Sequence, residues 1–302
     1  MKIVEKRRIW FTLSLVVILI GLIAMPIFYF IEGRALNYDL EFSGGTMLHV
    51  NIGQTFDNND IAKIVSDITG NNSPQIQKVT GKDEVIIKTL QMTEEQRDEV
   101  YDALKEKYNL TEGKDGDLLN FSSISPTVSG EMQVKALQAL LLSSLAMLFY
   151  ISFRFKDYRF GLSAVLALIH DILIMLTIYT VFRIPVNNSF IAAMLTIVGY
   201  SINDTIVIFD RLRENQPKMK KEPIEEIVNR SVNQTMRRSI STSFTTFVMI
   251  AVLYFLGVTS IKEFALPIMV GILAGTYSSI FIASPLWYTL KKYEEKKKTA
   301  KA

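Results

Sequence analysis

Three ionisable side chains lie within long apolar stretches of this 302-residue sequence. His170 and Asp171 are adjacent near the middle of one stretch, and Asp204 lies in the next stretch. Placing a charged residue at the centre of a membrane helix costs about 2.5 to 3.5 kcal/mol, so such residues are rare and usually serve a function. Two roles are open for each of them: a hydrogen-bonded group that holds helices together, or a site that binds and releases an ion.

Asp204 is the stronger candidate for ion binding, and Arg238 is its expected cationic partner. A nearby cation favours the ionised form of a carboxyl group, whereas burial favours the protonated form. An aspartate whose cationic partner approaches and withdraws therefore releases and takes up a proton. Asp204 and Arg238 are therefore predicted to form an ion-coupling pair between two neighbouring membrane helices.

The segment that follows Arg238 is rich in hydroxyl groups, which it carries at Ser239, Ser241, Thr242, Ser243, Thr245 and Thr246. Such residues could simply hold neighbouring helices together. They could equally line a hydrated route between the cytoplasm and Asp204, and we favour this interpretation because a titratable pair needs water or relay groups. We therefore expect the pair to be supported by other polar residues of the membrane helices, namely His170, Asp171, Asn203, Ser241, Thr242 and Thr245.

The composition excludes several other kinds of site. The sequence has no cysteine and only two histidines, His49 and His170, so it has no disulfide framework, no thiol nucleophile and no multi-histidine metal site. Gly44 and Gly45 precede an expected strand, but they belong to no phosphate-binding motif and predict a structural turn. We expect no cofactor, no metal, no nucleic-acid partner and no enzymatic activity, and we interpret His49 as an ordinary strand side chain.

Six apolar runs are long enough to cross a membrane as helices, which takes about 20 residues each. They cover residues 9–31, 136–153, 160–182, 184–209, 239–261 and 264–290. The first run follows four basic residues and exceeds the apolar core of a typical signal peptide, so we expect a retained anchor. The pattern predicts a polytopic α-helical membrane protein with six transmembrane helices, of which the third, fourth and fifth position the candidate residues.

The basic residues predict the orientation of these helices. If the N-terminus is cytoplasmic, the segments on that side contain 21 of the 33 basic residues and have a net charge of +12, whereas residues 32–132 have a net charge of −9. Positive segments remain in the cytoplasm. We therefore expect both termini inside and four regions: residues 1–31 (N-terminus and first helix), 32–132 (extracytoplasmic domain), 133–290 (helices two to six) and 291–302 (basic tail).

Within residues 32–132 the hydrophobic period alternates between that of strands and that of helices. We expect strands over 47–52, 74–79, 84–90 and 118–124, and helices over 57–69 and 93–108. Asp57 can cap the first helix, and Thr93 with Gln96 has capping-box spacing. The order βαββαβ resembles a ferredoxin-like fold, a scaffold that by itself specifies no function.

Several segments resemble motifs of the SecD/SecF family, whose members assist bacterial protein export. Residues 198–215 read VGYSINDTIVIFDRLREN and resemble the fourth-helix motif of that family at nearly every position. Similar matches are NQTMRRSISTSFTT over 233–246, ALIHD over 167–171 and, more loosely, SPTVSGEM over 125–132. Residues 40–46, LEFSGGT, are similar to the first exterior motif, with Asp39 in place of a glycine and Glu41 in place of an aspartate.

The resemblance covers the whole chain and implies half of a resistance-nodulation-division core, in which two six-helix halves use an ion gradient. It matches Asp204 to the family's proton-carrying aspartate and Arg238, rather than Arg237, to its arginine partner. The implied partners are a SecD-like subunit, the SecYEG channel with the SecA motor, and the unfolded polypeptide being exported. The implied function is proton-driven assistance to late export across the bacterial cytoplasmic membrane, with Na⁺ as an open alternative to H⁺.

Three other functions would also suit a chain with charges inside its membrane helices. A drug or lipid exporter of the same superfamily usually carries both halves and larger exterior domains in one chain. An intramembrane aspartyl protease could use Asp171 and Asp204, but it typically has Tyr-Asp and Gly-x-Gly-Asp motifs, whereas His170 and Asn203 precede the aspartates here. A passive scaffold of the translocation channel would tolerate loss of the intramembrane charges.

Overall fold

A computed structural model describes residues 1–71, 74–79, 81–111, 117–219 and 221–299. The chain forms two compact units. The helical unit comprises Met1–Asn37 and Ala136–Ala302, and the second unit, Tyr38–Lys135, is inserted between them in the sequence.

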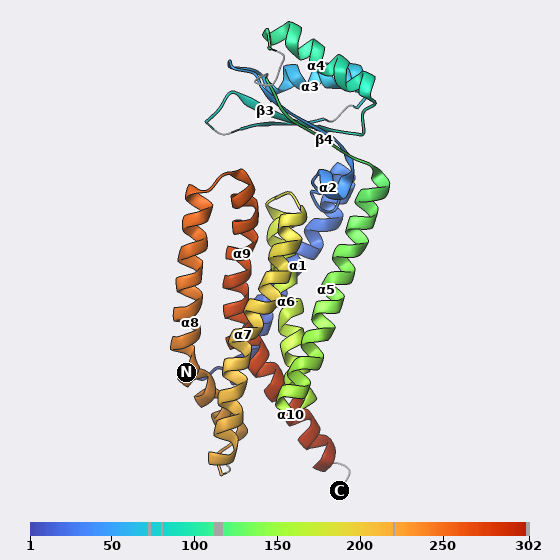
Figure 1. Ribbon diagram of the computed structural model, residues 1–302. Coiled ribbons are helices and arrows are strands. Elements are labelled where there is room, and N and C mark those ends of the chain that lie inside the picture. Colours follow the sequence, from blue (N-terminus) through green and yellow to red (C-terminus); the bar gives the residue numbers. More distant parts are fainter. Residues whose placement is uncertain (72–73, 80, 112–116, 220, 300–302) are drawn as a thin grey trace. The chain divides into compact units, whose positions relative to one another are not determined.

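The helical unit contains the six expected membrane-spanning helices, and this confirms a polytopic α-helical protein (Figure 1). The first five spans are α1 (Arg7–Glu32), α5 (Pro126–Phe155), α6 (Tyr158–Val181), α7 (Asn188–Lys218) and α8 (Ile224–Leu256). The last span is divided into α9 (Thr259–Ser278), the π-helix η1 (Ser279–Ala283) and α10 (Ser284–Thr299). The start of α1 and the end of α10 lie at the same end of this unit.

Several helices extend well beyond the apolar runs. Helix α8 begins at Ile224 although its apolar run begins only at Ser239, because the intervening polar residues continue the helix past the apolar region. The π-helix η1 occurs just before Pro285. Proline has no N–H to donate and its ring crowds the carbonyl four residues earlier, here that of Phe281, so a widened turn is expected at this point.

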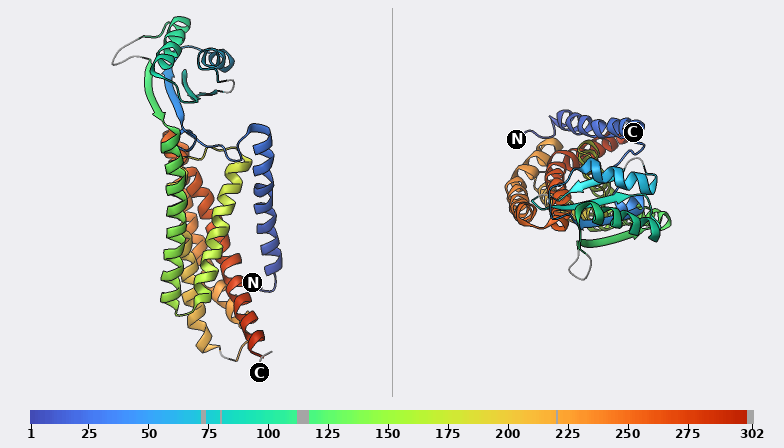
Figure 2. Two further views of the ribbon diagram at one scale, coloured as in Figure 1. Left: turned by 90° about the vertical axis from the view of Figure 1, so that its right-hand side faces the viewer. Right: turned by 90° about the horizontal axis from the view of Figure 1, so that it is seen from above.

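Helices α6 and α7 and the last span form the centre of the helical unit, since half or more of each is buried, while α1, α5 and α8 expose most of their surface. Glycines bring several pairs of helices into close contact. A Cβ atom on Gly21 of α1 would overlap Thr177 of α6, and one on Gly275 of α9 would lie 2.9 Å from the Cβ of Ser201 of α7. Gly271 lies against Ile197 in the same way. Helix α1 accordingly lies beside α6 (Figure 2).

The second unit is a four-stranded antiparallel sheet with the strand order β2-β3-β1-β4. Its strands are β1 (Gly45–Asn51), β2 (Gln75–Lys78), β3 (Glu84–Thr89) and β4 (Leu118–Ile124). Its helices are α2 (Leu40–Ser43), α3 (Asn58–Thr69) and α4 (Glu94–Tyr108). Apart from the short α2, these elements follow the order expected from the sequence.

One face of the sheet supplies the core of this unit, and α3 and α4 cover that face (Figure 1). Leu48 of β1 is opposite Ile87 of β3, and both are fully buried. Both expected helix caps are present: Asp57 accepts a hydrogen bond from the backbone N–H of Asn59 at 2.8 Å, and Thr93 forms the reciprocal capping box with Gln96. Because successive side chains of β1 alternate between the two faces of the sheet, His49 points away from the core. Its Nε2 lies 3.0 Å from Oε2 of Glu84.

Gly44 and Gly45 form the turn that leads into β1. Their φ angles are +69° and +125°, which side chains rarely adopt. A Cβ atom on Gly45 would also lie 2.2 Å from the carbonyl oxygen of Thr89. Backbone conformation and close packing therefore account for this glycine pair.

Candidate functional site

Asp204 is held inside the helical unit on α7, where only 5% of its surface is exposed. Its Oδ2 accepts a hydrogen bond of 3.2 Å from the hydroxyl of Ser243 on α8. Ser239 lies one turn earlier on α8 and is also buried. The carboxyl group thus faces hydroxyl groups of the neighbouring helix.

Arg238 is not in contact with Asp204. It lies on an exposed part of α8, and no ion pair joins it to any carboxylate among the residues that the structure describes. Ser243, the contact of Asp204, lies five residues after Arg238, which corresponds to about 7.5 Å along a helix axis. The two candidate residues therefore lie on adjoining helices without forming the expected pair.

The other polar residues expected around Asp204 point elsewhere. Asn203, Ser241, Thr242 and Thr245 are all exposed, and the hydroxyl of Thr245 donates to the carbonyl of Thr242 within its own helix. Residues four apart lie on one side of a helix. Ser239 and Ser243 therefore form the inward hydroxyl pair on α8, and this spacing could have been recognised in the sequence.

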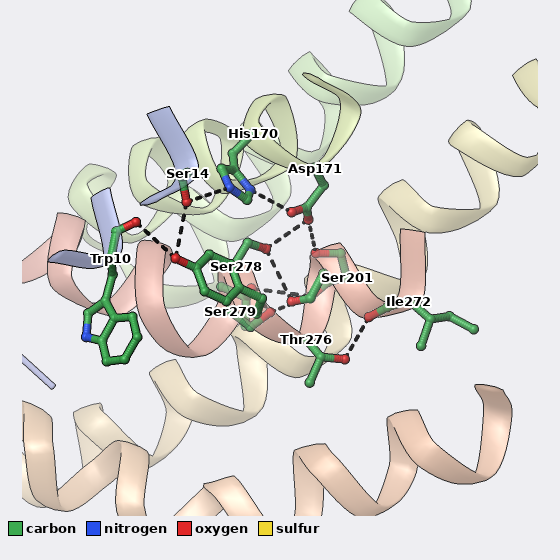
Figure 3. A network of polar contacts seen from close by, with 12 residues as sticks. Trp10, Ser14, His170, Asp171, Ser201, Ile272, Thr276, Ser278 and Ser279 are labelled. Carbon is green, nitrogen blue, oxygen red and sulfur yellow. Dashed lines mark hydrogen bonds and ion pairs between the residues drawn. The ribbon is translucent and has the colours of Figure 1, made fainter. Parts of the chain in front are cut away.

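Asp171 is the centre of a more extensive polar cluster (Figure 3). The residue is 1% exposed. Its Oδ2 accepts hydrogen bonds from the hydroxyls of Ser201 on α7, at 2.6 Å, and Ser278 on α9, at 2.9 Å. Its Oδ1 lies 3.0 Å from Nδ1 of His170. Both oxygens of the carboxyl group therefore have partners.

His170 connects this cluster to the first helix. Its Nε2 lies 3.0 Å from the hydroxyl of Ser14 on α1, and its ring is stacked on Tyr277 with 5.9 Å between centroids. The Ser14 hydroxyl donates to the Tyr277 oxygen at 3.3 Å, and Tyr277 donates to the carbonyl of Trp10 at 2.9 Å. Figure 3 shows the hydrogen bonds running from the Trp10 carbonyl to Ser201.

The same network continues along α7 toward Asp204. The Ser279 hydroxyl donates to the carbonyl of Ser201 at 3.2 Å and lies 2.9 Å from the hydroxyl of Thr205. Thr205 follows Asp204 directly in the sequence. The cluster of Asp171 and the carboxyl group of Asp204 thus share helix α7.

Four members of this cluster were not predicted: Ser14, Ser201, Tyr277 and Ser278. Each is a polar residue in an otherwise apolar run, which is the signal that could have identified it. Among the described residues, no group of three or more His, Asp or Glu side chains could hold a metal ion.

Comparison with known proteins relates the whole chain to protein export. Residues 104–293 match the family model described as "Protein export membrane protein SecD/SecF, C-terminal". The chain is 34% identical to protein translocase subunit SecF of Sebaldella termitidis, over 100% of this chain and 95% of the relative. It is 36% identical to the subunit of the same name from Thermodesulfovibrio yellowstonii, over 95% of this chain and 93% of the relative.

A solved structure is similar in fold as well. The crystal structure of SecDF, a translocon-associated membrane protein from Thermus thermophilus, aligns with a TM-score of 0.81 and 32% identity. The alignment covers 97% of this chain but only 39% of the SecDF chain.

Proposed function

Because this chain belongs to the SecD/SecF family of protein-export membrane proteins, we propose that it is the SecF-like subunit of the accessory complex of the Sec translocase and that a proton gradient drives it. Its six spans and its family make it a multi-pass protein of the bacterial membrane. Its relatives are named as translocase subunits. The observation that carries the proposed coupling is the buried carboxyl group of Asp204, which accepts a hydrogen bond from the hydroxyl of Ser243 and forms no ion pair among the residues described.

Asp204 is the proton-binding group in this proposal. A buried ion without a countercharge is strongly unfavourable, and a carboxyl group in that setting binds a proton instead. The hydrogen bond from the Ser243 hydroxyl does not supply a countercharge. We assign the arrangement with Arg238 turned away to the proton-bound state.

Arg238 is the group that replaces the proton. It lies at the entrance of the same helix that supplies Ser243, so a small movement of α8 relative to α7 brings the guanidinium group toward the carboxylate. Protons enter from outside, bind Asp204, weaken its pairing with Arg238 and leave to the cytoplasm. A charge that crosses the membrane potential contributes about 2.3 kcal/mol per 100 mV, which is enough to bias a two-state motion.

The second unit is the part that acts on the exported chain in this proposal. The asymmetry of basic residues supports an orientation with both termini in the cytoplasm and an extracytoplasmic domain over residues 32–132. The strand order β2-β3-β1-β4 and the two helices on one face support a ferredoxin-like fold. The domain holds the emerging unfolded polypeptide and hinders its return, and the partners are a SecD-like subunit, SecYEG and SecA.

The test replaces Asp204→Asn in the complex with its SecD-like partner, reconstituted in vesicles with the export channel. We expect export to lose its stimulation by an imposed proton gradient, while the complex assembles normally. Asp210→Asn is the matched control, because Asp210 lies on the same helix but is half exposed and paired with Arg154 at 3.3 Å. Unchanged stimulation in the Asp204 variant would contradict ion coupling and would favour a passive scaffold.

A further inference from the structure

A row of buried hydroxyl groups runs along α8 from Asp204 toward the C-terminal end of α7. Its members are spaced four residues apart, at Ser243, Ser239, Thr235 and Ser231. Residues with this spacing lie on one side of a helix. At one end of the row Ser243 donates to Asp204, and at the other end Ser231 accepts a hydrogen bond of 2.9 Å from Nδ2 of Asn215 on α7. We call the four hydroxyl residues together with Asn215 the polar seam.

The antiparallel packing of α7 and α8 keeps the polar seam between the two helices (Figure 1). Asp204 and Asn215 are 11 residues apart on α7, and their partners Ser243 and Ser231 are 12 residues apart on α8. At 1.5 Å per residue these intervals are about 16.5 Å and about 18 Å, so the two helices stay in step. The polar seam therefore follows the contact between α7 and α8 from Asp204 to Asn215.

The two middle hydroxyls of the polar seam do not hold the helices together. Thr235 donates to the carbonyl of Ser231 within its own helix at 3.1 Å. The Ser239 hydroxyl faces the Asp204 carboxyl group, but it makes no hydrogen bond of normal geometry among the residues described. The buried side chains of α7 between Asp204 and Asn215 are mostly apolar, so that helix offers few partners. A buried hydroxyl needs a partner, and water commonly supplies it.

The spacing within the polar seam suits water molecules. Side chains four residues apart on a helix have Cβ atoms about 5–6 Å apart, which is too far for two hydroxyls to bond each other directly. One water molecule spans this distance with two hydrogen bonds of about 2.8 Å each. Each interval between Ser243 and Ser231 therefore matches one bridging water.

The polar seam reaches the protein surface at Gln234. The Nδ2 atom of Asn215 donates to Oε1 of Gln234 at 2.9 Å, and this exposed side chain also accepts a hydrogen bond of 2.8 Å from Nε of Arg211. Among the described residues of α7 and α8, Asp204 is the only ionisable one that is buried. No second buried acid or base on these helices therefore traps a proton between Asp204 and the surface.

We propose that the polar seam is the route by which the proton of Asp204 leaves to the cytoplasm, an inference that rests on the proton coupling proposed above. The carboxylic acid gives its proton to a water molecule beside Ser239 and becomes a carboxylate, whose countercharge is Arg238. The proton then passes from water to water toward Asn215. The hydroxyls position these waters and do not ionise. The Asn215 end is cytoplasmic in the proposed orientation, because it lies among the basic residues of 210–238.

The test uses the absence of cysteine from the sequence. Full-length chains carrying Ser239→Cys or Thr235→Cys are assembled with the SecD-like partner in membrane vesicles and exposed to silver ion in chloride-free buffer. Silver ion is close to water in size and replaces the proton of a thiol that water can reach. The thiols that remain free are then counted with a maleimide after unfolding. Ser241→Cys and Thr245→Cys are the matched controls, because they make the same substitutions at exposed positions of the apolar part of α8.

We expect silver to block the two seam cysteines at least about ten times faster than the two control cysteines, because a thiol in apolar surroundings stays protonated and inert. The reaction should occur only from the side of the membrane on which Gln234→Cys reacts. Equal rates in seam and control variants, or reaction from the opposite side, would overturn the route.

A second measurement uses export in vesicles that contain the channel. Thr235→Val keeps the volume of the side chain but removes its hydroxyl, and it should lose most of the stimulation by a proton gradient, whereas Thr235→Ser should keep it. Thr196→Val is the matched control, since Thr196 also bonds a carbonyl of its own helix but is exposed. Equal stimulation in the two valine variants would overturn the route. Silver labelling needs no gradient, so a dry seam would leave the role of Asp204 standing, whereas unchanged stimulation in Asp204→Asn would overturn both proposals.

Discussion

Gly21 of α1 is a point of close approach between the first helix and α6. A Cβ atom at this position would lie 2.2 Å from Oγ1, 2.7 Å from Cβ and 2.8 Å from Cα of Thr177 on α6. The Thr177 side chain could rotate, but its Cα belongs to the backbone and cannot. Gly21→Ala must therefore move one helix away from the other.

The size of the effect follows from these distances. Relieving the contact with Cα requires a separation of at least about 0.6 Å, the difference between 2.8 Å and the 3.4 Å at which ordinary contacts begin. Ser14 lies two turns earlier on the same side of α1, so its 3.0 Å contact with His170 would lengthen to a distance that is no longer a hydrogen bond. Overpacking costs about 1–3 kcal/mol and a lost hydrogen bond about 0.5–1.5 kcal/mol, so we expect a loss of roughly 1.5–4.5 kcal/mol.

The assay is reversible unfolding of the purified chain by sodium dodecyl sulfate in mixed micelles, which gives the free energy of unfolding. Gly199→Ala is the matched control, because the same substitution in the interior of α7 meets no atom within 4 Å. The control should be unchanged, or more stable by up to about 1 kcal/mol, since alanine favours helix over glycine.

Equal stability of the two variants would contradict the close contact described between α1 and α6. A Gly21 variant within about 0.5 kcal/mol of the Gly199 variant would show that α1 and α6 are farther apart than described.

Two further predictions concern the second unit. Leu48→Ala should destabilise this unit by about 2–5 kcal/mol, because the side chain is fully buried beneath α3 and α4. Leu119→Ala, at a half-exposed position, should change the stability by less than about 0.5 kcal/mol. Hydrogen exchange of the strand amides measures both effects, and equal protection in the two variants would contradict the assigned core. The pKa of Glu84 lies below its usual value of 4.5, chiefly because Lys82 donates a hydrogen bond to its carboxylate. The ionised carboxylate therefore stabilises the folded unit at pH values above the unfolded-state pKa. This contribution to stability disappears as the pH falls through the lower folded-state pKa. Glu84→Gln should therefore make the stability of the unit less dependent on pH in the acid range, and an equally steep acid transition in thermal unfolding would argue against it.

The spans and the elements of the second unit could be predicted from the sequence because their causes are local. About 20 apolar residues in a row specify a membrane helix whatever surrounds them. Alternation in β1, the 3.6-residue period of α3 and the capping box at Thr93 likewise depend on neighbours in the chain. Prediction was weaker at helix ends: α8 begins 15 residues before its apolar run, since polar residues can continue a helix beyond the membrane.

Asp204, His170 and Asp171 were recognised from the sequence alone, because an ionisable residue in an apolar run is costly wherever the run lies. Their partners were decided by the tertiary structure. Ser14 is 156 residues from His170, and Ser278 is 107 residues from Asp171. Only the packing of α1 and α9 against α6 brings these hydroxyls within hydrogen-bonding distance, and glycines such as Gly21 and Gly275 make that approach possible. A sequence shows which side chains need partners, whereas the packing of helices distant in the chain determines which partners they obtain.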